Sequence, residues 1–127
     1  MEENVNNQEE VVDSKLSILT SIKKMLGISE SCTDFDTDII IHINTVLMVL
    51  GQLGVGKEGF QIEDKTALWT EFIDKDKLSA AKSYTYLRVR LLFDPPLNSA
   101  ILESMERTIQ ELSVRLNIEA ESDDEEV

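Results

Sequence analysis

One stretch of the chain, residues 51–58 (GQLGVGKE), comes within one residue of a phosphate-binding loop. Gly51, four further residues and Gly56-Lys57 match the pattern G-x-x-x-x-G-K-[ST], in which backbone N–H groups and the lysine surround nucleotide phosphates. The last position requires a hydroxyl group that binds Mg²⁺, but the residue there is Glu58. A working loop also follows a strand, whereas a helical pattern precedes this one. We therefore interpret the stretch as a helix end and a glycine-rich turn, and not as an ATP site.

Residues 34–38 (DFDTD) begin like a calcium-binding loop, with an acidic residue at every second position. The following position should be glycine and is Ile39, and the twelfth should be glutamate and is Thr45. Acidic residues also favour the first turn of a helix, where they interact with the helix dipole. The only histidine, His42, and the only cysteine, Cys32, have no metal-ligating or catalytic partners at a suitable spacing. We expect no catalytic residue, no metal site and no cofactor, and no enzyme activity.

The net charge of −13 is concentrated towards the two ends of the chain. Residues 1–13 contain five acidic residues, residues 119–127 contain six, and all 12 basic residues lie between these segments. Segments of one charge are commonly solvated and flexible, so we expect one domain over residues 14–118, a flexible acidic segment over 1–13 and an acidic tail over 119–127. The nearly neutral domain lacks the basic face on which nucleic-acid binding depends.

The location of the protein can also be predicted from composition. The most apolar run, residues 39–50, has 12 residues, whereas a membrane-spanning helix needs about 20. The acidic N-terminus lacks the basic and apolar regions of a signal peptide, and a single cysteine excludes an intramolecular disulfide. We therefore expect a soluble intracellular protein that makes no membrane contact.

Apolar residues recur at helical spacing, which predicts an all-α fold. We expect a small bundle of about four main helices, over residues 14–26, 34–53, 76–93 and 98–117, with a short extra helix at 66–73. Residues 54–65 form a turn-rich connection in which Gly56 and Gly59 permit tight turns. Asn98 or Ser99 should start the last helix. The core-facing stripe of the second helix is predicted to be Ile39, Ile43, Val46, Leu47, Leu50 and Leu53. The core-facing residues of the last two helices are predicted to be Ala80, Tyr84, Leu87 and Leu91, and then Ile101, Met105, Ile109, Leu112 and Leu116.

Local signals indicate where the first two helices begin and end. Asp13 or Ser14 can cap the first helix, and Gly27 suits its C-terminal exit. Thr33 with Asp36 three residues later fits a capping box, which predicts the start of the second helix.

Two sets of residues form a candidate inter-subunit face. The first set makes the second main helix apolar on more than one side, as in a helix at the centre of a core or one that meets another subunit. The second set is a basic cluster on the third helix, which is either a solvated, salt-bridged face or a docking face for acidic segments of a neighbour. The sets are Ile40, Ile41 and Met48, and then Lys82, Arg88 and Arg90.

Four stretches carry a resemblance to a known family: residues 34–44 (DFDTDIIIHIN), 59–62 (GFQI), 84–96 (YTYLRVRLLFDPP) and 115–117 (RLN). Over about residues 14–118, the chain resembles the head–tail connector, or adaptor, proteins of tailed bacteriophages. The order of helices expected above agrees with the helical bundle of that family.

This resemblance implies a virion protein at the head–tail junction, present in the host cytoplasm during assembly. Its copies would form a homo-oligomeric ring of twelve beneath the portal protein and extend the channel through which genomic DNA passes without specific binding. The ring would receive a stopper or tail-completion protein, and no enzyme activity or cofactor is implied. The connection between the second and third main helices would face the tail or the lumen, with the candidate residues Gly54, Gly56, Lys57, Glu58, Gly59, Phe60 and Ile62.

In such a ring, the acidic C-terminal residues could have either of two functions. A negative lumen would repel DNA and let it slide, or the tail would bind a basic surface of the portal and be needed for docking. A small cytosolic regulatory or scaffold protein with a helical docking face is the alternative function. The candidate portal-docking residues are Glu119, Glu121, Asp123, Asp124, Glu125 and Glu126.

Overall fold

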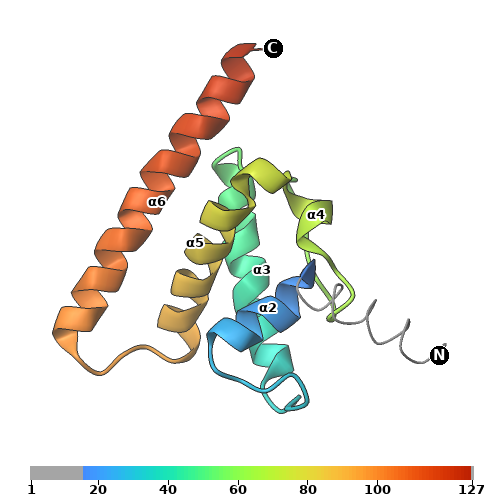
Figure 1. Ribbon diagram of the computed structural model, residues 1–127, viewed down its shortest axis with the longest axis vertical. Coiled ribbons are helices and arrows are strands. Elements are labelled where there is room, and N and C mark those ends of the chain that lie inside the picture. The colour runs from blue at the N-terminus through green and yellow to red at the C-terminus, as the bar shows by residue number, and fades with distance from the viewer. Residues whose placement is uncertain (1–15, 127) are drawn as a thin grey trace, which may run out of the picture.

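The computed structural model describes residues 16–126 and the side chains of residues 16–121. The described chain contains the helices α2 (Ile18–Met25), α3 (Asp36–Gln52), α4 (Trp69–Phe72), α5 (Lys75–Phe93) and α6 (Ser99–Glu126). An isolated bridge between Ser17 and Leu68 is the only β-type pairing among these residues. Figure 1 shows α3, α5 and α6 running along one another, with α2 and α4 on the far side from α6. The predicted all-α bundle is confirmed; the segment 1–13 lies outside the described residues.

Helix α3 lies at the centre of the core. It buries one face against α5, and α5 in turn packs against α6. The predicted stripe of α3 is buried, and its members recur at the spacing of three or four residues that keeps side chains on one face. The buried members are Ile39, Ile43, Val46, Leu47 and Leu50, whereas Leu53, the sixth predicted member, is half-buried at the C-cap.

The predicted faces of α5 and α6 are correct only in part. In α5, Tyr84 is buried as predicted, but the other buried positions are Ala81, Thr85 and Val89. The other predicted residues, Ala80, Leu87 and Leu91, are half-buried and pack against this core. The helix therefore buries a wider arc than predicted, because it contacts both α3 and α6. In α6, Ile109 and Leu116 are buried, whereas Ile101 is 52% exposed since it lies in the first turn, beyond most of the bundle.

Helix α2 buries polar residues as well as apolar ones. Ser17, and not an earlier residue, caps the helix: its Oγ accepts a hydrogen bond from the Thr20 N–H at 3.2 Å. The buried Trp69 indole donates to Ser21 Oγ at 2.8 Å, which ties α4 to α2. Asp13 and Ser14, the expected caps, lie outside the described residues, and the exit at Gly27 is confirmed by its φ of 82°.

The predicted capping box of α3 is wrong. Phe35 occupies the N-cap position and makes no side-chain cap hydrogen bond. The Asp36 carboxylate instead forms an ion pair with Lys23 Nζ at 2.8 Å. Thr33 contributes its backbone carbonyl, which accepts from the Asp36 N–H at 3.2 Å. The Asp36 side chain, which the local pattern assigned to the cap, is therefore paired with the buried Lys23 of α2 instead.

The predicted end of the last helix near Asn117 is also wrong, because α6 continues to Glu126. Residues 119–126 are thus helical, where an irregular flexible tail was expected. Ala120, which is only 5% exposed, gives a physical reason. It packs against the turn after α3, where a Cβ atom placed on Gly54 would lie 3.4 Å from the Ala120 Cβ. Tertiary contact therefore supports the helix beyond the predicted boundary.

Candidate docking surfaces

The stretch that resembles a phosphate-binding loop has no free cradle of N–H groups. Gly51 lies within α3, and the next helix does not begin until Trp69. The N–H groups of Gly54, Val55 and Lys57 donate to carbonyls of this chain at 2.8–3.1 Å. Nucleotide phosphates would need these donors. The interpretation as a helix end and a turn is confirmed.

The stretch that resembles a calcium loop has a structural role. Asp36 pairs with Lys23, and Phe35 packs its ring edge-on against Phe93, with ring centroids 5.6 Å apart. Within residues 16–126, no group of three or more His, Cys, Asp or Glu side chains is arranged to hold a metal ion. The stretch joins α3 to α2 and to the end of α5.

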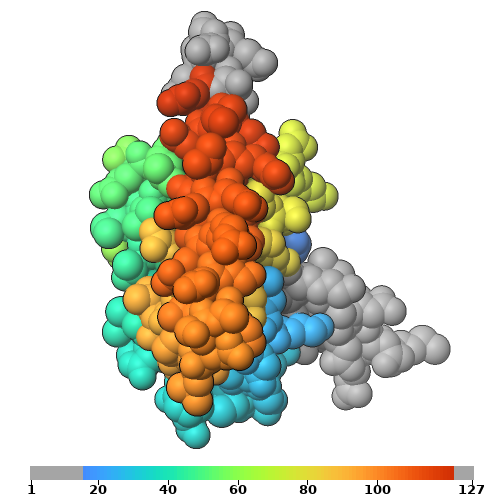
Figure 2. Space-filling model, turned by 90° about the vertical axis from the view of Figure 1, so that its left-hand side faces the viewer, coloured from blue at the N-terminus to red at the C-terminus, as the bar shows by residue number. Residues whose placement is uncertain are grey.

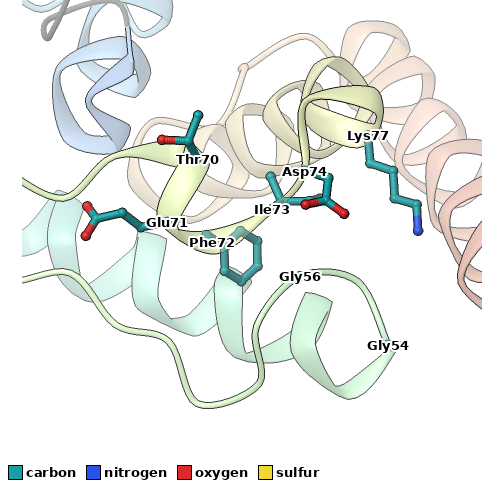
Figure 3. Close-up of a pocket in the computed structure, with 8 residues that line it drawn as sticks. All are labelled: Gly54, Gly56, Thr70, Glu71, Phe72, Ile73, Asp74 and Lys77. Carbon is teal, nitrogen blue, oxygen red and sulfur yellow. The ribbon is translucent and has the colours of Figure 1, made fainter.

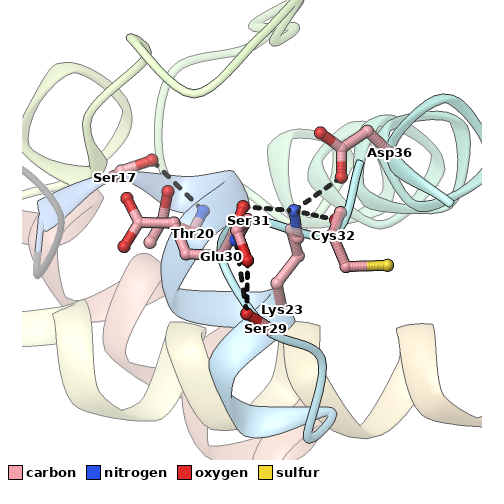
Figure 4. Close-up of polar contacts among 8 residues, drawn as sticks. All are labelled: Ser17, Thr20, Lys23, Ser29, Glu30, Ser31, Cys32 and Asp36. Carbon is pink, nitrogen blue, oxygen red and sulfur yellow. Dashed lines mark hydrogen bonds and ion pairs between the residues drawn. The ribbon is translucent and has the colours of Figure 1, made fainter. Parts of the chain in front are cut away.

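Lys23 is a buried cation that sequence reasoning missed. Its side chain is only 3% exposed, and its Nζ donates to the Cys32 carbonyl at 2.7 Å and the Glu30 carbonyl at 3.2 Å, beside Asp36 (Figure 4). A buried ammonium group is tolerated only when it is paired and hydrogen-bonded. Lys23 therefore fixes the connection between α2 and α3. The signal available in the sequence was its place on the apolar side of α2, next to Ile22.

The predicted tail-side loop is exposed over only part of its length. Gly54, Gly56, Lys57, Glu58 and Gly59 are exposed. The three glycines have positive φ values of 84°, 75° and 79°, which confirms the predicted tight turns at the last two. Within residues 54–59, every residue except the buried Val55 can therefore be reached by a partner.

The remaining loop residues hold the loop to the bundle. Phe60 is half-buried against Phe72, with ring centroids 5.4 Å apart. Ile62 is only 2% exposed, and its backbone makes two hydrogen bonds with the Asn44 side chain, at 2.8 and 3.0 Å. Asn44 thus acts as a clamp between α3 and the loop, which the sequence did not indicate.

A close approach between the loop and α4 explains why residue 56 is a glycine. Figure 3 shows the Phe72 ring directed towards Gly56 in the pocket beside the start of α5. A Cβ atom on Gly56 would lie 2.5–2.8 Å from three carbons of this ring. Only glycine therefore fits at this position, both for its φ and for the space.

The loop and the acidic tail lie at the same end of the bundle. Gly54 meets Ala120, and the last residues of α6 extend beyond this contact at the top of Figure 1. We call this the acidic end, and define it as residues 54–59 together with residues 119–126. In this conformation, one end of the molecule carries both the predicted tail-side loop and the predicted portal-docking tail.

The opposite end exposes five large apolar side chains beside the exposed acidic residues Glu30, Asp34, Asp38 and Asp94. The end of α2, the start of α3 and the α5–α6 connection lie at the bottom of Figure 1. Leu97 is fully exposed there, between Pro96 and Asn98. Asn98 Oδ1 accepts hydrogen bonds from two N–H groups at the start of α6, at 2.8 and 3.2 Å, so the predicted start at Asn98 or Ser99 is confirmed. The apolar end is defined by the exposed residues Met25, Phe35, Leu92, Leu97 and Ile101.

The three members of the first predicted inter-subunit set differ in exposure. Ile41 and Met48 are 57% and 53% exposed, whereas Ile40 is half-buried against the core. Two further apolar side chains, Val114 and Ile118, are 60% and 57% exposed on α6 and were not singled out from the sequence.

The basic cluster on α5 is engaged with its own helix. Arg88 Nε donates to the Tyr84 hydroxyl at 3.2 Å, and its guanidinium lies 5.5 Å from the centre of that ring. Arg90 Nε donates to the Asp94 carbonyl at 2.8 Å. Lys82 is half-buried on the same helix. The arginines are thus held in fixed positions along α5.

These features define a small all-helical module with large exposed apolar side chains at one end of the bundle and on α3 and α6. Residues 18–123 match the family described as phage connector protein, and the chain belongs to this family. Its role is therefore that of a structural connector in a phage particle, as the resemblance implied. No curated protein and no solved structure matches the chain. No helix within residues 16–126 is long and apolar enough to cross a membrane.

Proposed function

We propose that copies of this chain form a ring beneath the portal, extend the DNA channel and receive the stopper or tail-completion protein. The observation that carries this proposal is the match to the phage connector family over residues 18–123, which covers nearly all of the helical bundle. The geometry supports it, because an elongated bundle with two chemically different ends can contact one neighbour above the ring and another below it.

The orientation follows from the shared position of the loop and the acidic tail. The resemblance implies that the loop faces the tail or the lumen, so the acidic end as a whole takes that side. Residues 119–126 would then add negative charge near the channel, where it repels DNA and prevents it from sticking. The apolar end would face the portal.

The apolar end suits a permanent protein contact. Leu97 is presented by Pro95-Pro96 on one side and the Asn98 cap on the other. The prolines and the cap restrain the backbone on either side of Leu97, and burying a leucine contributes about 1.5–3 kcal/mol. A fully exposed leucine on a restrained backbone is therefore well suited to anchor the ring on an apolar socket of the portal.

The opposite orientation, in which the acidic tail binds a basic portal surface, is distinguished by two variants of the full chain. We expect Leu97→Glu to weaken binding to the portal of the same phage at least tenfold, because a charged group would replace the apolar anchor. We expect neutralisation of the six acidic residues of the tail to leave portal binding unchanged. If neutralisation abolishes binding and Leu97→Glu does not, the tail binds the portal and the orientation is reversed. If the unaltered chain does not bind the portal, the connector ring itself is refuted.

A further inference from the structure

We infer that the end of α6 is a charge-dependent extension of the helix. Residues 121–126 are helical when their negative charge is neutralised, and they unwind when it is not. The structure describes the helical state, in which α6 continues to Glu126. The inference concerns the chain by itself and goes beyond its proposed role in a ring.

Packing supports α6 only as far as Ala120. This side chain is 5% exposed and meets the turn after α3, where a Cβ atom on Gly54 would lie 3.4 Å from the Ala120 Cβ. In Figure 2, α6 runs down the front of the molecule, with the green end of α3 on one side and the yellow α4–α5 segment on the other. Glu121 is exposed, and the end of α6 extends beyond α3 and α5 at the top of Figure 1. The helix beyond Ala120 therefore depends on its own backbone and its own charges.

The helix dipole opposes the charge of this extension. The C-terminal end of an α-helix carries a partial negative charge, which basic residues stabilise and acidic residues destabilise. The last turn of α6 contains no basic residue. Residues 121–126 contain five acidic residues, and Arg115, the last basic residue of the chain, lies six positions before Glu121. Negative charge is thus concentrated at the end of the helix where it is least favourable.

Like charges also follow one another at helical spacing. Residues three or four positions apart are neighbours on an α-helix, and like charges at this spacing are destabilising. Glu119 and Asp123 are four positions apart. Glu121 lies three positions before Asp124 and four before Glu125. Because an unwound chain lets these charges move apart, their repulsion adds to the effect of the dipole.

The neighbouring segments at the acidic end do not neutralise the extension. The loop 54–59 contains one lysine and one glutamate. Residues 74–77, at the start of α5, contain two lysines and two aspartates. Three basic and three acidic residues leave these segments with no net charge. The neutralising charge therefore has to come from outside the chain, as counterions or as a cationic partner.

In the proposed ring, this extension would respond to the partner that binds at the acidic end. The acidic ends of neighbouring copies would lie on the same side of the ring, and their mutual repulsion would favour the unwound state. A partner with a basic surface would supply the missing positive charge and complete the helix. This consequence rests on the proposed ring, whereas the charge dependence of the chain itself does not.

NMR spectroscopy of the full chain, in low-salt buffer at neutral pH, tests the inference. Cα chemical shifts report the ratio of helical to unwound backbone at residues 122–125. The test variant combines Glu121→Gln, Glu125→Gln and Glu126→Gln, which removes charge with little change in helix propensity. We expect these residues to be mostly unwound in the unaltered chain. In the variant, the ratio should rise by about tenfold, because unfavourable dipole and like-charge interactions are both removed.

The matched control makes the same three replacements nearer the start of α6. It combines Glu103→Gln, Glu106→Gln and Glu111→Gln, all at exposed positions. These residues lie far from the C-terminal end of the helix, and the dipole acts mainly within the last turn. The ratio at residues 122–125 should therefore remain that of the unaltered chain.

Each other outcome overturns the inference. A complete helix over residues 122–125 in the unaltered chain would show that the extension needs no neutralisation. An unwound end in both the unaltered chain and the test variant would show that charge does not cause the unwinding. An equal gain in the control would assign the effect to the charge of the whole helix. Because the measurement uses the chain alone, failure of this inference leaves the connector role standing, and failure of portal binding leaves this inference standing.

Discussion

The loop at the acidic end depends on a close contact between Gly56 and Phe72, and the substitution Gly56→Ala tests it. Gly56 has a φ of 75°, and its added Cβ would lie 2.5–2.8 Å from the ring. The left-handed conformation costs a non-glycine residue about 1–2 kcal/mol. Forcing a methyl group into a filled space costs about 1–3 kcal/mol more. We therefore expect a loss of about 2–5 kcal/mol in the free energy of unfolding.

Gly59 provides a matched control for this prediction. It has nearly the same φ, 79°, but a Cβ atom there would meet nothing within 4 Å. Gly59→Ala should therefore cost only the conformational part, about 1–2 kcal/mol. Urea unfolding of both variants, followed by circular dichroism, measures the difference. Equal losses at the two positions would refute the claim that the Phe72 ring fixes the loop.

Two further substitutions test the contacts that the sequence did not reveal. Lys23→Met should cost about 3–5 kcal/mol of stability, because it leaves the Asp36 carboxylate and two carbonyls without their cation. Lys24→Met, at the exposed neighbouring position, should change stability by less than about 0.5 kcal/mol, and a similar loss at both would contradict this account. Asn44→Ala should cost about 1–3 kcal/mol and accelerate hydrogen exchange at the Ile62 amide, whereas unchanged exchange would mean that the clamp is not needed.

The elements that could be predicted from the sequence are those whose cause is local. The stripe of α3 repeats from Ile39 to Leu50, over about three helical turns, so the helix and its buried face were both identified correctly. Glycine at a helix exit or in a tight turn, as at Gly27 and Gly56, also acts through local backbone geometry. Asn98 was identified as a start signal for the same reason, since its side chain bonds to N–H groups two and three residues later.

The errors occur where distant residues decide the outcome. Asp36 would have been available to a cap if Lys23 had not been buried beside it. The end of α6 depends on Ala120 meeting a turn that lies 66 positions earlier in the chain. The face of α5 is set by its two neighbouring helices at once. None of these contacts leaves a periodic trace in the sequence.

The candidate surfaces show the same division. The apolar excess of α3 predicted Ile41 and Met48, because a second apolar side is visible in the helical pattern. Val114 and Ile118 were not identified, since they stand among charged residues that read as an ordinary solvated face. The common position of the loop and the acidic tail required the structure, because it depends on how α6 packs back along α3 and α5.

The central claim is that this chain completes a connector ring on the portal. Native mass measurement of the full chain, alone and mixed with the portal of the same phage, tests it most directly. The account predicts that each portal oligomer gains one copy of this chain per portal subunit. A chain that stays free at every ratio, as a monomer or dimer, would contradict the account and favour a regulatory role through other protein partners.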